Sequence, residues 1–396
     1  MLYLLWVNLE KWLDDLGVRW MFKILDQLTF RALAAAAIAF FVVVLLGRPV
    51  IGWLRRKKIG DAGLADTALL ASAAQSKANV PTMGGLLICA AIVGATGLLG
   101  DVSNAYLVAG LLVLTFLAGL GSVDDWLKLT AASRPGGSRQ GLHSWEKLIF
   151  QLGLGFLVAW FVYNKGDTAG TAKDVAHVLS LPFQATYEGG GLKLNPGVIE
   201  LPKMLFVFIG VLMIAGMSNA LNITDGMDGL AAGTTAIVSL GMAVLVYVAG
   251  WQTAAQYLLV PYIADSSELL VLIAATAGAC LGFLWWNCSP AQVFMGDTGS
   301  LALGGVLGYL AIVIRQEALL LIMSGVFLME ISSVVMQVGY FKYTRRRTGA
   351  GQRLFRVAPI HHHFHIVGWT EQTVVTRFWI ITAILVIAAL ALVKVR

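Results

Sequence analysis

The sequence predicts an all-α, polytopic integral membrane protein with about ten transmembrane helices. Hydrophobic residues make up 58% of the 396 residues and charged residues only 13%, and the mean hydropathy is +0.78. This apolar content is well above that of a soluble globular domain. Several stretches reach the roughly 20 apolar residues that cross a bilayer core, with Trp and Tyr near their ends. No soluble domain of useful size is left over.

The first 28 residues are predicted to form an amphipathic helix at the membrane surface. Acidic residues interrupt any apolar stretch of signal-peptide length, no small-residue cleavage site follows, and tryptophans would anchor the helix in the interface. The acidic residues are Glu10, Asp14 and Asp15, and the tryptophans are Trp6, Trp12 and Trp20.

Residues 29–396 are predicted to form one transmembrane domain of ten helices. The apolar stretches that define these spans follow one another along the chain. They lie at 29–47, 82–99, 105–122, 148–163, 203–218, 229–249, 268–285, 299–314, 317–339 and 374–393.

The charges of the links orient the spans. The links at 48–81, 124–147 and 340–373 hold sixteen of the 28 Lys and Arg residues. The 250–267 link holds none, and acidic residues offset the lysines of the 164–202 link. By the positive-inside rule the three basic links are cytoplasmic, which places both termini on the outer side.

Three acidic clusters and a histidine run then fall together on the cytoplasmic face. Carboxylates are rare in this chain and costly beside a membrane, so their convergence on one face indicates a single site. The groups are Asp124 with Asp125, Asp225 with Asp228, Asp297, and the histidines between 361 and 365.

Adjacent carboxylates such as Asp124 and Asp125 can hold a divalent cation, or one can act as a base while the other binds metal. A solvated acidic cap at the membrane border is the alternative for this pair. Asp297 lies in a glycine-bounded turn before a helix, where an N-cap is the alternative to a metal ligand.

The stretch from Asn219 to Gly229 alternates acidic residues with glycine between two spans. The glycines let the backbone approach a ligand closely, and the polar side chains offer amide and carboxylate partners. Asn219 and Asn222 are three residues apart and are therefore expected on one helix face. A plain turn is the alternative.

The histidine run lies in a basic loop before the last span. Histidine can shuttle protons, bind metal or, when protonated, hold a phosphate, so a phosphate or pyrophosphate site is predicted; incidental surface histidines are the alternative. Lys77, with the glycine turn at 81–85 before a helix, adds an anion contact.

These residues lie in motifs that closely resemble those of the bacterial phospho-N-acetylmuramoyl-pentapeptide transferases (translocase I), within the polyprenyl-phosphate N-acetylhexosamine-1-phosphate transferases. The resemblance runs from about residue 29 to the C-terminus. Its motifs are Lys77 with PTMGG at 81–85, VDDWLK at 123–128, NALNITDGMDGL at 219–230, WNCSPAQVFMGDTGSLALGG at 286–305 and RVAPIHHHF at 356–364.

The resemblance implies a bacterial inner-membrane enzyme that converts UDP-N-acetylmuramoyl-pentapeptide and undecaprenyl phosphate into lipid I and UMP with Mg²⁺. It also implies uridine-containing nucleoside inhibitors and no nucleic acid partner, and it leaves a homodimer open. Direct attack by the lipid phosphate on the β-phosphate is preferred, and a covalent aspartyl-phosphate is the alternative.

The resemblance also implies roles for individual residues. Asp297 would be the principal metal ligand, Asp124 the base on the lipid phosphate, Asp125 a metal or lysine partner, and His361 a further catalytic residue. Phe294 would stack on uracil. The other expected substrate-binding residues are Lys77, Thr82, Lys128, Asn219, Asn222, Asp225, Gly226, Met227, Asp228, Asn287, His362 and His363.

Two features depart from the family pattern. The loop Ala131 to Gln140 is longer than usual, with Gln140 where a lysine often occurs, and the 164–202 link is extended. Two other functions remain open from the sequence. One is a sister enzyme that transfers N-acetylglucosamine 1-phosphate, and the other is a proton-coupled transporter, which would need charged residues near the bilayer midplane.

Overall fold

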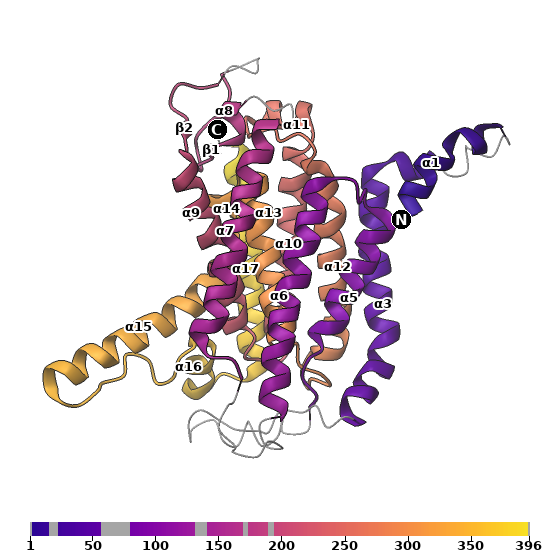
Figure 1. Ribbon diagram of the computed structural model, residues 1–396. Coiled ribbons are helices and arrows are strands. Elements are labelled where there is room, and N and C mark those ends of the chain that lie inside the picture. Colours follow the sequence, from indigo (N-terminus) through magenta and orange to yellow (C-terminus); the bar gives the residue numbers. More distant parts are fainter. Residues whose placement is uncertain are drawn as a thin grey trace.

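The computed structural model describes residues 2–15, 23–56, 80–130, 141–168, 173–188 and 194–394. These residues form an upright bundle of long helices, with one helix projecting from it at each end (Figure 1). Lys77 and the loop Ala131 to Gln140 lie outside the described residues.

Most of the described chain is helical. The long helices are α3 (Leu28–Arg56), α5 (Gly85–Leu99), α6 (Ala105–Thr130), α7 (Ser144–Thr168), α9 (Lys203–Thr224), α10 (Leu230–Ala249), α12 (Leu269–Asn287), α13 (Gly296–Val313), α15 (Gly325–Thr348) and α17 (Glu371–Lys394). Shorter elements are α1 (Leu2–Asp15), η1 (Lys23–Asp26), α8 (Lys173–Ala176), α11 (Gln252–Leu258), η4 (Ser266–Glu268), α14 (Glu317–Met323) and α16 (Ile360–Val367).

The all-α membrane fold is confirmed, because all ten predicted spans fall on helices and eight helices among the described residues are long and apolar enough to cross a membrane. The second span differs from its prediction at 82–99, since its helix α5 begins only at Gly85. The backbone N–H groups of Gly84 and Gly85 instead donate to the carbonyls of Phe294 and Met295, at 2.8 and 2.9 Å.

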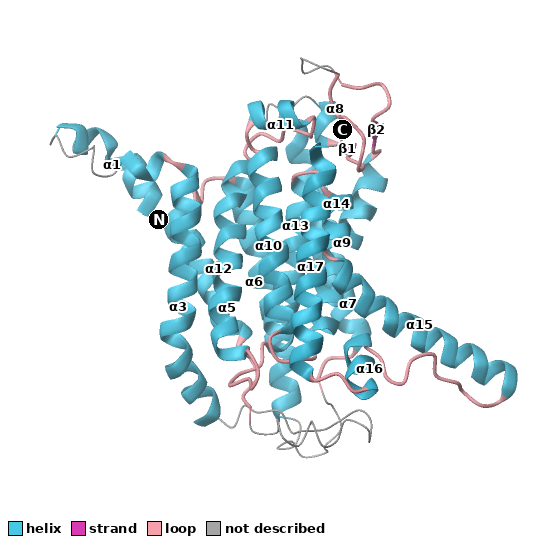
Figure 2. Cartoon of the chain, turned by 180° about the vertical axis from the view of Figure 1, so that it is seen from behind, coloured by secondary structure: helices cyan, strands magenta, loops and turns pink. Residues whose placement is uncertain are grey.

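The ninth span, predicted at 317–339, is broken into α14 and α15, which meet at 78°. The hydroxyl of Ser324, between the two helices, donates to the Leu320 carbonyl at 2.6 Å. The last turn of α15 carries Arg345, Arg346 and Arg347, which would be costly within a bilayer core. The helix accordingly leaves the bundle sideways (Figure 2).

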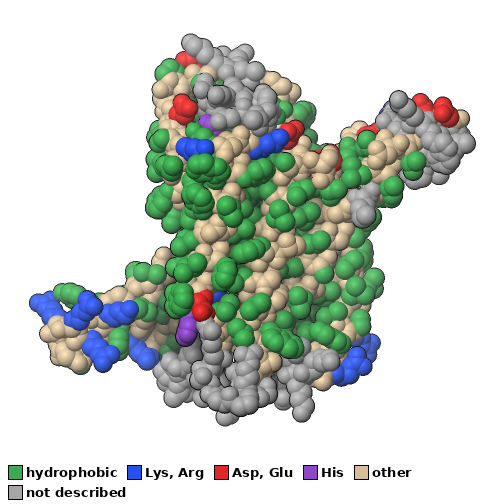
Figure 3. Space-filling view, in the orientation of Figure 1, with side chains coloured by type: hydrophobic (Ala, Val, Ile, Leu, Met, Phe, Trp, Pro, Cys, Tyr) green, Lys and Arg blue, Asp and Glu red, His purple; other side chains and the backbone are tan. Residues whose placement is uncertain are grey.

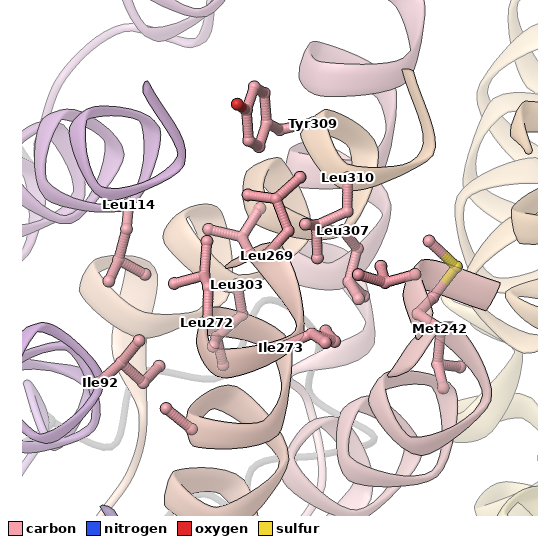
Figure 4. Packing of buried hydrophobic residues seen from close by; sticks show 14 of the residues in the cluster. Ile92, Leu114, Met242, Leu269, Leu272, Ile273, Leu303, Leu307, Tyr309 and Leu310 are labelled. Atoms are coloured by element: carbon pink, nitrogen blue, oxygen red, sulfur yellow. The ribbon is translucent and has the colours of Figure 1, made fainter. Parts of the chain in front are cut away.

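Helix α13 lies at the centre of the bundle, and 89% of its span is buried. Its leucines, among them Leu303 and Leu307, pack against apolar side chains of α5, α6, α10 and α12 (Figure 4). On another side, Gly304 and Gly308 lie directly against the α9 backbone, where a β-carbon would overlap the carbonyl oxygens of Met217 and Met213. The small residues let the backbones of α9 and α13 approach each other closely.

The two ends of the bundle differ in chemistry. One end carries α8, α11 and a two-stranded antiparallel hairpin of β1 (Val178–Leu179) and β2 (Ile199–Glu200), in which Val178 pairs with Glu200. The opposite end carries α16 and the basic tips of α3 and α15. Apolar side chains cover much of the surface between the two ends (Figure 3). The N and C labels both lie in the half nearer the hairpin (Figure 1). The side of the membrane on which each end lies stays a prediction.

We expect Gly308→Val to destabilise the bundle, because its side chain must push the α9 backbone away from α13. Overpacking of this kind typically costs about 1–3 kcal/mol. Thermal unfolding of the purified protein in detergent measures the effect. Gly216→Val in α9 is the control, since a β-carbon there meets nothing within 4 Å. Equal melting temperatures for the two variants would contradict the close α9–α13 contact.

Candidate active site

Three carboxylates meet where α6 ends and α13 begins. Asp124 and Asp125 lie near the end of α6, which continues beyond the predicted end of the span at 122, and Asp297 lies in the first turn of α13. One oxygen from each of the three lies within 4.8 Å of the others. Gly121 permits this approach, because a β-carbon there would overlap the backbone of Asp297 and Thr298.

Asp125 holds the start of α13. Its Oδ1 accepts the backbone N–H of Asp297 at 3.2 Å, and its Oδ2 accepts the backbone N–H and the hydroxyl of Thr298 at 3.0 and 2.7 Å. The first N–H groups of a helix have no partners within it and carry partial positive charge, so the buried carboxylate and the helix end satisfy each other. Both oxygens of Asp125 are therefore engaged by the helix that carries Asp297.

Two lysines bridge the other two carboxylates. Lys128 lies 2.7 Å from Asp124 Oδ2 and 3.3 Å from Asp297 Oδ2, and Lys147 lies 3.2 and 2.8 Å from the same atoms. Asp124 is fully buried, and its Oδ1 accepts the backbone N–H of Leu142 at 2.6 Å. The ammonium groups compensate charges that would be very unfavourable alone in this environment.

Lys147 was not among the residues predicted for the site, although it contacts both carboxylates. In the sequence analysis Lys147 contributed only to the positive charge that orients the 124–147 link. Gln151, one turn further along α7, was missed as well; it is buried, and its side chain donates to the hydroxyl of Ser218 at 3.1 Å. The spacing of these two polar residues on one face of an apolar helix was the available signal.

The two asparagines of α9 have different partners. The Asn222 amide donates to Asp297 Oδ1 at 2.8 Å and to the Ser300 hydroxyl at 2.9 Å. The Asn219 amide donates to Gln151 Oε1 at 2.7 Å. Asn222 is thus in direct contact with the carboxylate cluster, whereas Asn219 joins α9 to α7.

The turn at 225–229 follows α9 and lies beside the cluster. Asp225 is partly buried, and burial together with the charges of Asp297 and Asp125 raises its pKa to about 7 from the ordinary 3.8. Gly229 has φ +80°, a left-handed conformation that favours glycine. The alternating acid and glycine therefore form a tight turn whose first carboxylate faces the site.

Asp228 and Asn287 hold this turn against the 288–295 loop. Asp228 Oδ2 accepts the backbone N–H of Ala291 at 3.0 Å. Asn287 accepts the backbone N–H of Gly229 at 3.0 Å and donates to the Val293 carbonyl at 2.8 Å. Both residues, expected to bind substrate, thus shape the backbone on which Phe294 is placed.

Thr82 and Phe294 lie on segments that are hydrogen-bonded to each other. The Phe294 N–H donates to the Pro81 carbonyl at 2.8 Å. Gly296, with φ +74°, faces both Thr82 and Asp125, since a β-carbon there would lie 2.9 Å from Thr82 Oγ1 and 2.7 Å from Asp125 Oδ2. The structure thus brings Thr82 to the carboxylate cluster.

The three predicted histidines occupy different surroundings on α16. His361 is fully buried, and its Nδ1 lies 3.0 Å from Glu330 Oε2. His362 and His363 are partly exposed, and His363 Nδ1 accepts the backbone N–H of Arg356 at 3.2 Å. Met227, also expected at the site, packs in an apolar cluster of α10, α15 and α17.

The carboxylate cluster fits a hard divalent cation. Oxygen ligands from several carboxylates are what Mg²⁺ and Ca²⁺ take in proteins, and three such residues are within reach of one ion here. Asp124 and Asp297 each direct one oxygen at the lysine ammonium groups, so this position already favours positive charge.

Comparisons with known proteins show the family of the chain. Residues 106–315 match the family model of glycosyl transferase family 4. The chain is 40% identical to a phospho-N-acetylmuramoyl-pentapeptide-transferase of Salinibacter ruber over 95% of this chain and 96% of the relative. It is 39% identical to the protein of the same name from Chlorobium chlorochromatii over 98% of each. The chain therefore belongs to glycosyl transferase family 4 and, within it, to the phospho-N-acetylmuramoyl-pentapeptide-transferases.

We expect Asp225→Asn to stabilise the metal-free protein more at pH 8 than at pH 5. Because the folded-state pKa of Asp225 is raised to about 7, the fold favours the protonated carboxyl, and this preference becomes a growing penalty as the pH rises toward and through 7. Asparagine carries no charge at either pH. Thermal unfolding with a chelator measures the difference.

The exposed Asp265, at the other end of the bundle, supplies the control variant Asp265→Asn. This variant removes a carboxylate far from the cluster, and the pH-dependent gain of Asp225→Asn should exceed its change. A gain for Asp225→Asn that does not depend on pH would contradict the raised pKa.

Proposed function

We propose that the chain transfers phospho-N-acetylmuramoyl-pentapeptide from its UDP-activated form to undecaprenyl phosphate, giving lipid I and UMP in the first membrane step of peptidoglycan synthesis. The observation that carries this proposal is the buried cluster of Asp124, Asp125 and Asp297 with Lys128 and Lys147, at the end of an apolar bundle. Two relatives that match nearly the whole chain bear the name of this activity.

The residues of the cluster suit phosphoryl transfer, in which positioning and charge compensation supply most of the catalysis. Lys128 and Lys147 would bind phosphate oxygens. Asp124 Oδ2 would accept a proton from the lipid phosphate, whose oxygen then forms a bond to the β-phosphorus while the bond from that phosphorus to UMP breaks. Asp125 would keep Asp297 in place through its contacts with the start of α13.

Mg²⁺ is the proposed cofactor, held mainly by Asp297 with Asp124 and Asp125 nearby, and it would neutralise charge on the phosphates. An attack by Asp124 or Asp125 itself, giving an aspartyl-phosphate, is the alternative route. Asp125 is poorly placed for that role, because both its oxygens accept hydrogen bonds from the first turn of α13.

The nucleotide would lie against the loop and turn that adjoin the cluster. Phe294 would stack on uracil, and Thr82 would contact phosphate. The remaining residues proposed to surround the donor substrate are Lys77, Asn219, Asn222, Asp225, Gly226, Met227, Asp228, Asn287, His361, His362 and His363.

The proposed setting is the bacterial inner membrane, with the cluster on the cytoplasmic face, both termini outside and residues 1–28 at the outer surface. The apolar middle of the bundle and the basic tips of α3 and α15 support this orientation. The carboxylates stand at helix ends rather than mid-helix, which favours an enzyme at the membrane border over a proton-coupled transporter.

The test is an assay of the purified protein with labelled UDP-N-acetylmuramoyl-pentapeptide, undecaprenyl phosphate and Mg²⁺. We expect a labelled lipid product together with UMP. A product formed only from UDP-N-acetylglucosamine would instead identify the sister N-acetylglucosamine-1-phosphate transferase, and no transfer from either nucleotide would refute the proposal.

We expect Asp297→Asn to abolish Mg²⁺-dependent turnover, since the amide keeps the shape but loses the charge that holds metal and lysines. Initial rates across a Mg²⁺ titration measure the effect, and Asp265→Asn is the control at the far end of the bundle. Near-normal turnover of Asp297→Asn at ordinary Mg²⁺ would remove Asp297 from the metal site.

We expect Phe294→Ala to weaken binding of the UDP substrate, because loss of an aromatic platform costs on the order of 1 to 3 kcal/mol of base stacking. Titration with UMP and with a uridine-containing inhibitor measures the loss. Phe208→Ala is the matched control, since Phe208 is 59% exposed on α9. Unchanged affinity of a folded Phe294→Ala protein would place the uracil elsewhere.

A further inference from the structure

A buried acid–histidine pair joins α15 to α16 next to the site. Glu330 lies in the second turn of α15, just after the bend from α14, and His361 lies at the start of α16. Both side chains are 0% exposed, and Glu330 Oε2 lies 3.0 Å from His361 Nδ1. Among the described residues, the other ring nitrogen, Nε2, has no hydrogen-bond partner, and neither has Glu330 Oε1.

The free nitrogen is aimed at the turn that follows α9. A β-carbon at Gly226 would overlap His361 Nε2, so the imidazole rests directly against this glycine. Gly226 is exposed, and therefore only a residue without a side chain separates Nε2 from the surface of the site. Buried polar atoms are nearly always paired in native proteins, so an unpaired ring nitrogen at such a place calls for a ligand that completes it.

We infer that Glu330 is a positioning residue that prepares His361 to bind the UDP-linked substrate. This inference rests on the proposed function. The Glu330 carboxylate accepts the Nδ1 proton of His361, which fixes both the ring orientation and the tautomer. Nε2 is then an acceptor, and it takes a hydrogen bond from a hydroxyl or amide N–H of the donor substrate once the Gly226 turn adjusts to that substrate.

The chemistry of Nε2 separates this role from a phosphate contact. The proposed neutral form of His361, with its proton on Nδ1, offers only a lone pair at Nε2, which an ionised phosphate oxygen cannot use. Lys128 and Lys147 already supply cations for phosphates at the carboxylate cluster. Sugar hydroxyls and the N-acetyl amide are the hydrogen-bond donors that such a substrate presents. His361 therefore binds the sugar end of the substrate.

The test compares Glu330→Gln with Glu330→Asp. Glutamine keeps the size of the side chain but can donate as well as accept, so it no longer fixes the tautomer of His361. We expect the KM for the UDP-linked substrate to rise about tenfold in Glu330→Gln, the scale of one hydrogen bond to a positioned group, while the KM for undecaprenyl phosphate stays unchanged. Aspartate keeps the charge and should restore part of the loss.

The pairing with His361 is tested by a double-mutant cycle. If Glu330 acts through His361, then Glu330→Gln has no further effect on this KM in a His361→Gln background. Glu317→Gln is the matched control, because Glu317 is also a buried glutamate, and it pairs with Arg315 outside the site. Thermal unfolding of every variant separates loss of fold from loss of binding.

Additive effects in the cycle, equal rises in both KM values, or wild-type kinetics of Glu330→Gln would each overturn the inference. Failure of the proposed function looks different, since the wild-type protein itself would then make no lipid-linked product.

Discussion

The site depends on the contact between Asp125 and the first turn of α13. An ionised carboxylate is costly beside a membrane, and a helix start in the same place leaves N–H groups without partners. The carboxylate and the helix start offset each other's desolvation penalty here, because Asp125 accepts hydrogen bonds from the backbones of Asp297 and Thr298. The backbone that carries the Asp297 side chain is therefore held by a residue of another helix, and the lysines and Asn222 contact its carboxylate.

Close packing of the helix backbones allows Asp125 to reach the first turn of α13. Gly121 on α6 and Gly304 and Gly308 on α13 leave no β-carbon between neighbouring helices. Lipid tails are as apolar as the side chains, so helices in a membrane gain from such close approach rather than from hydrophobic exclusion. Among these glycines, Gly121 sets the spacing between Asp297 and the carboxylates of α6, Asp124 and Asp125.

The fold and the carboxylates could be predicted from the sequence, because span length, charge asymmetry and acidic motifs are local patterns. The partners of those carboxylates could not. Lys147 and Gln151 belong to an apolar helix whose neighbours depend on tertiary packing, and Glu330 is one acid in a stretch that was predicted as a straight span. Asn219 and Asn222 share a helical spacing, yet one contacts α7 and the other Asp297, since the neighbours of α9 differ along its length.

The break between α14 and α15 has a consequence for the site that a straight span would not allow. Because the chain bends by 78° between α14 and α15, Glu330 contacts His361 of α16 instead of lying further along the bundle. His361 is thereby pressed against Gly226, while the backbone N–H of Asp228 donates to Glu371 at the start of α17, at 2.9 Å. The turn at 225–229 is held from the α16 side at its beginning and from the α17 side at its end, so the C-terminal third of the chain determines where Asp225 stands relative to the carboxylates of α6 and α13.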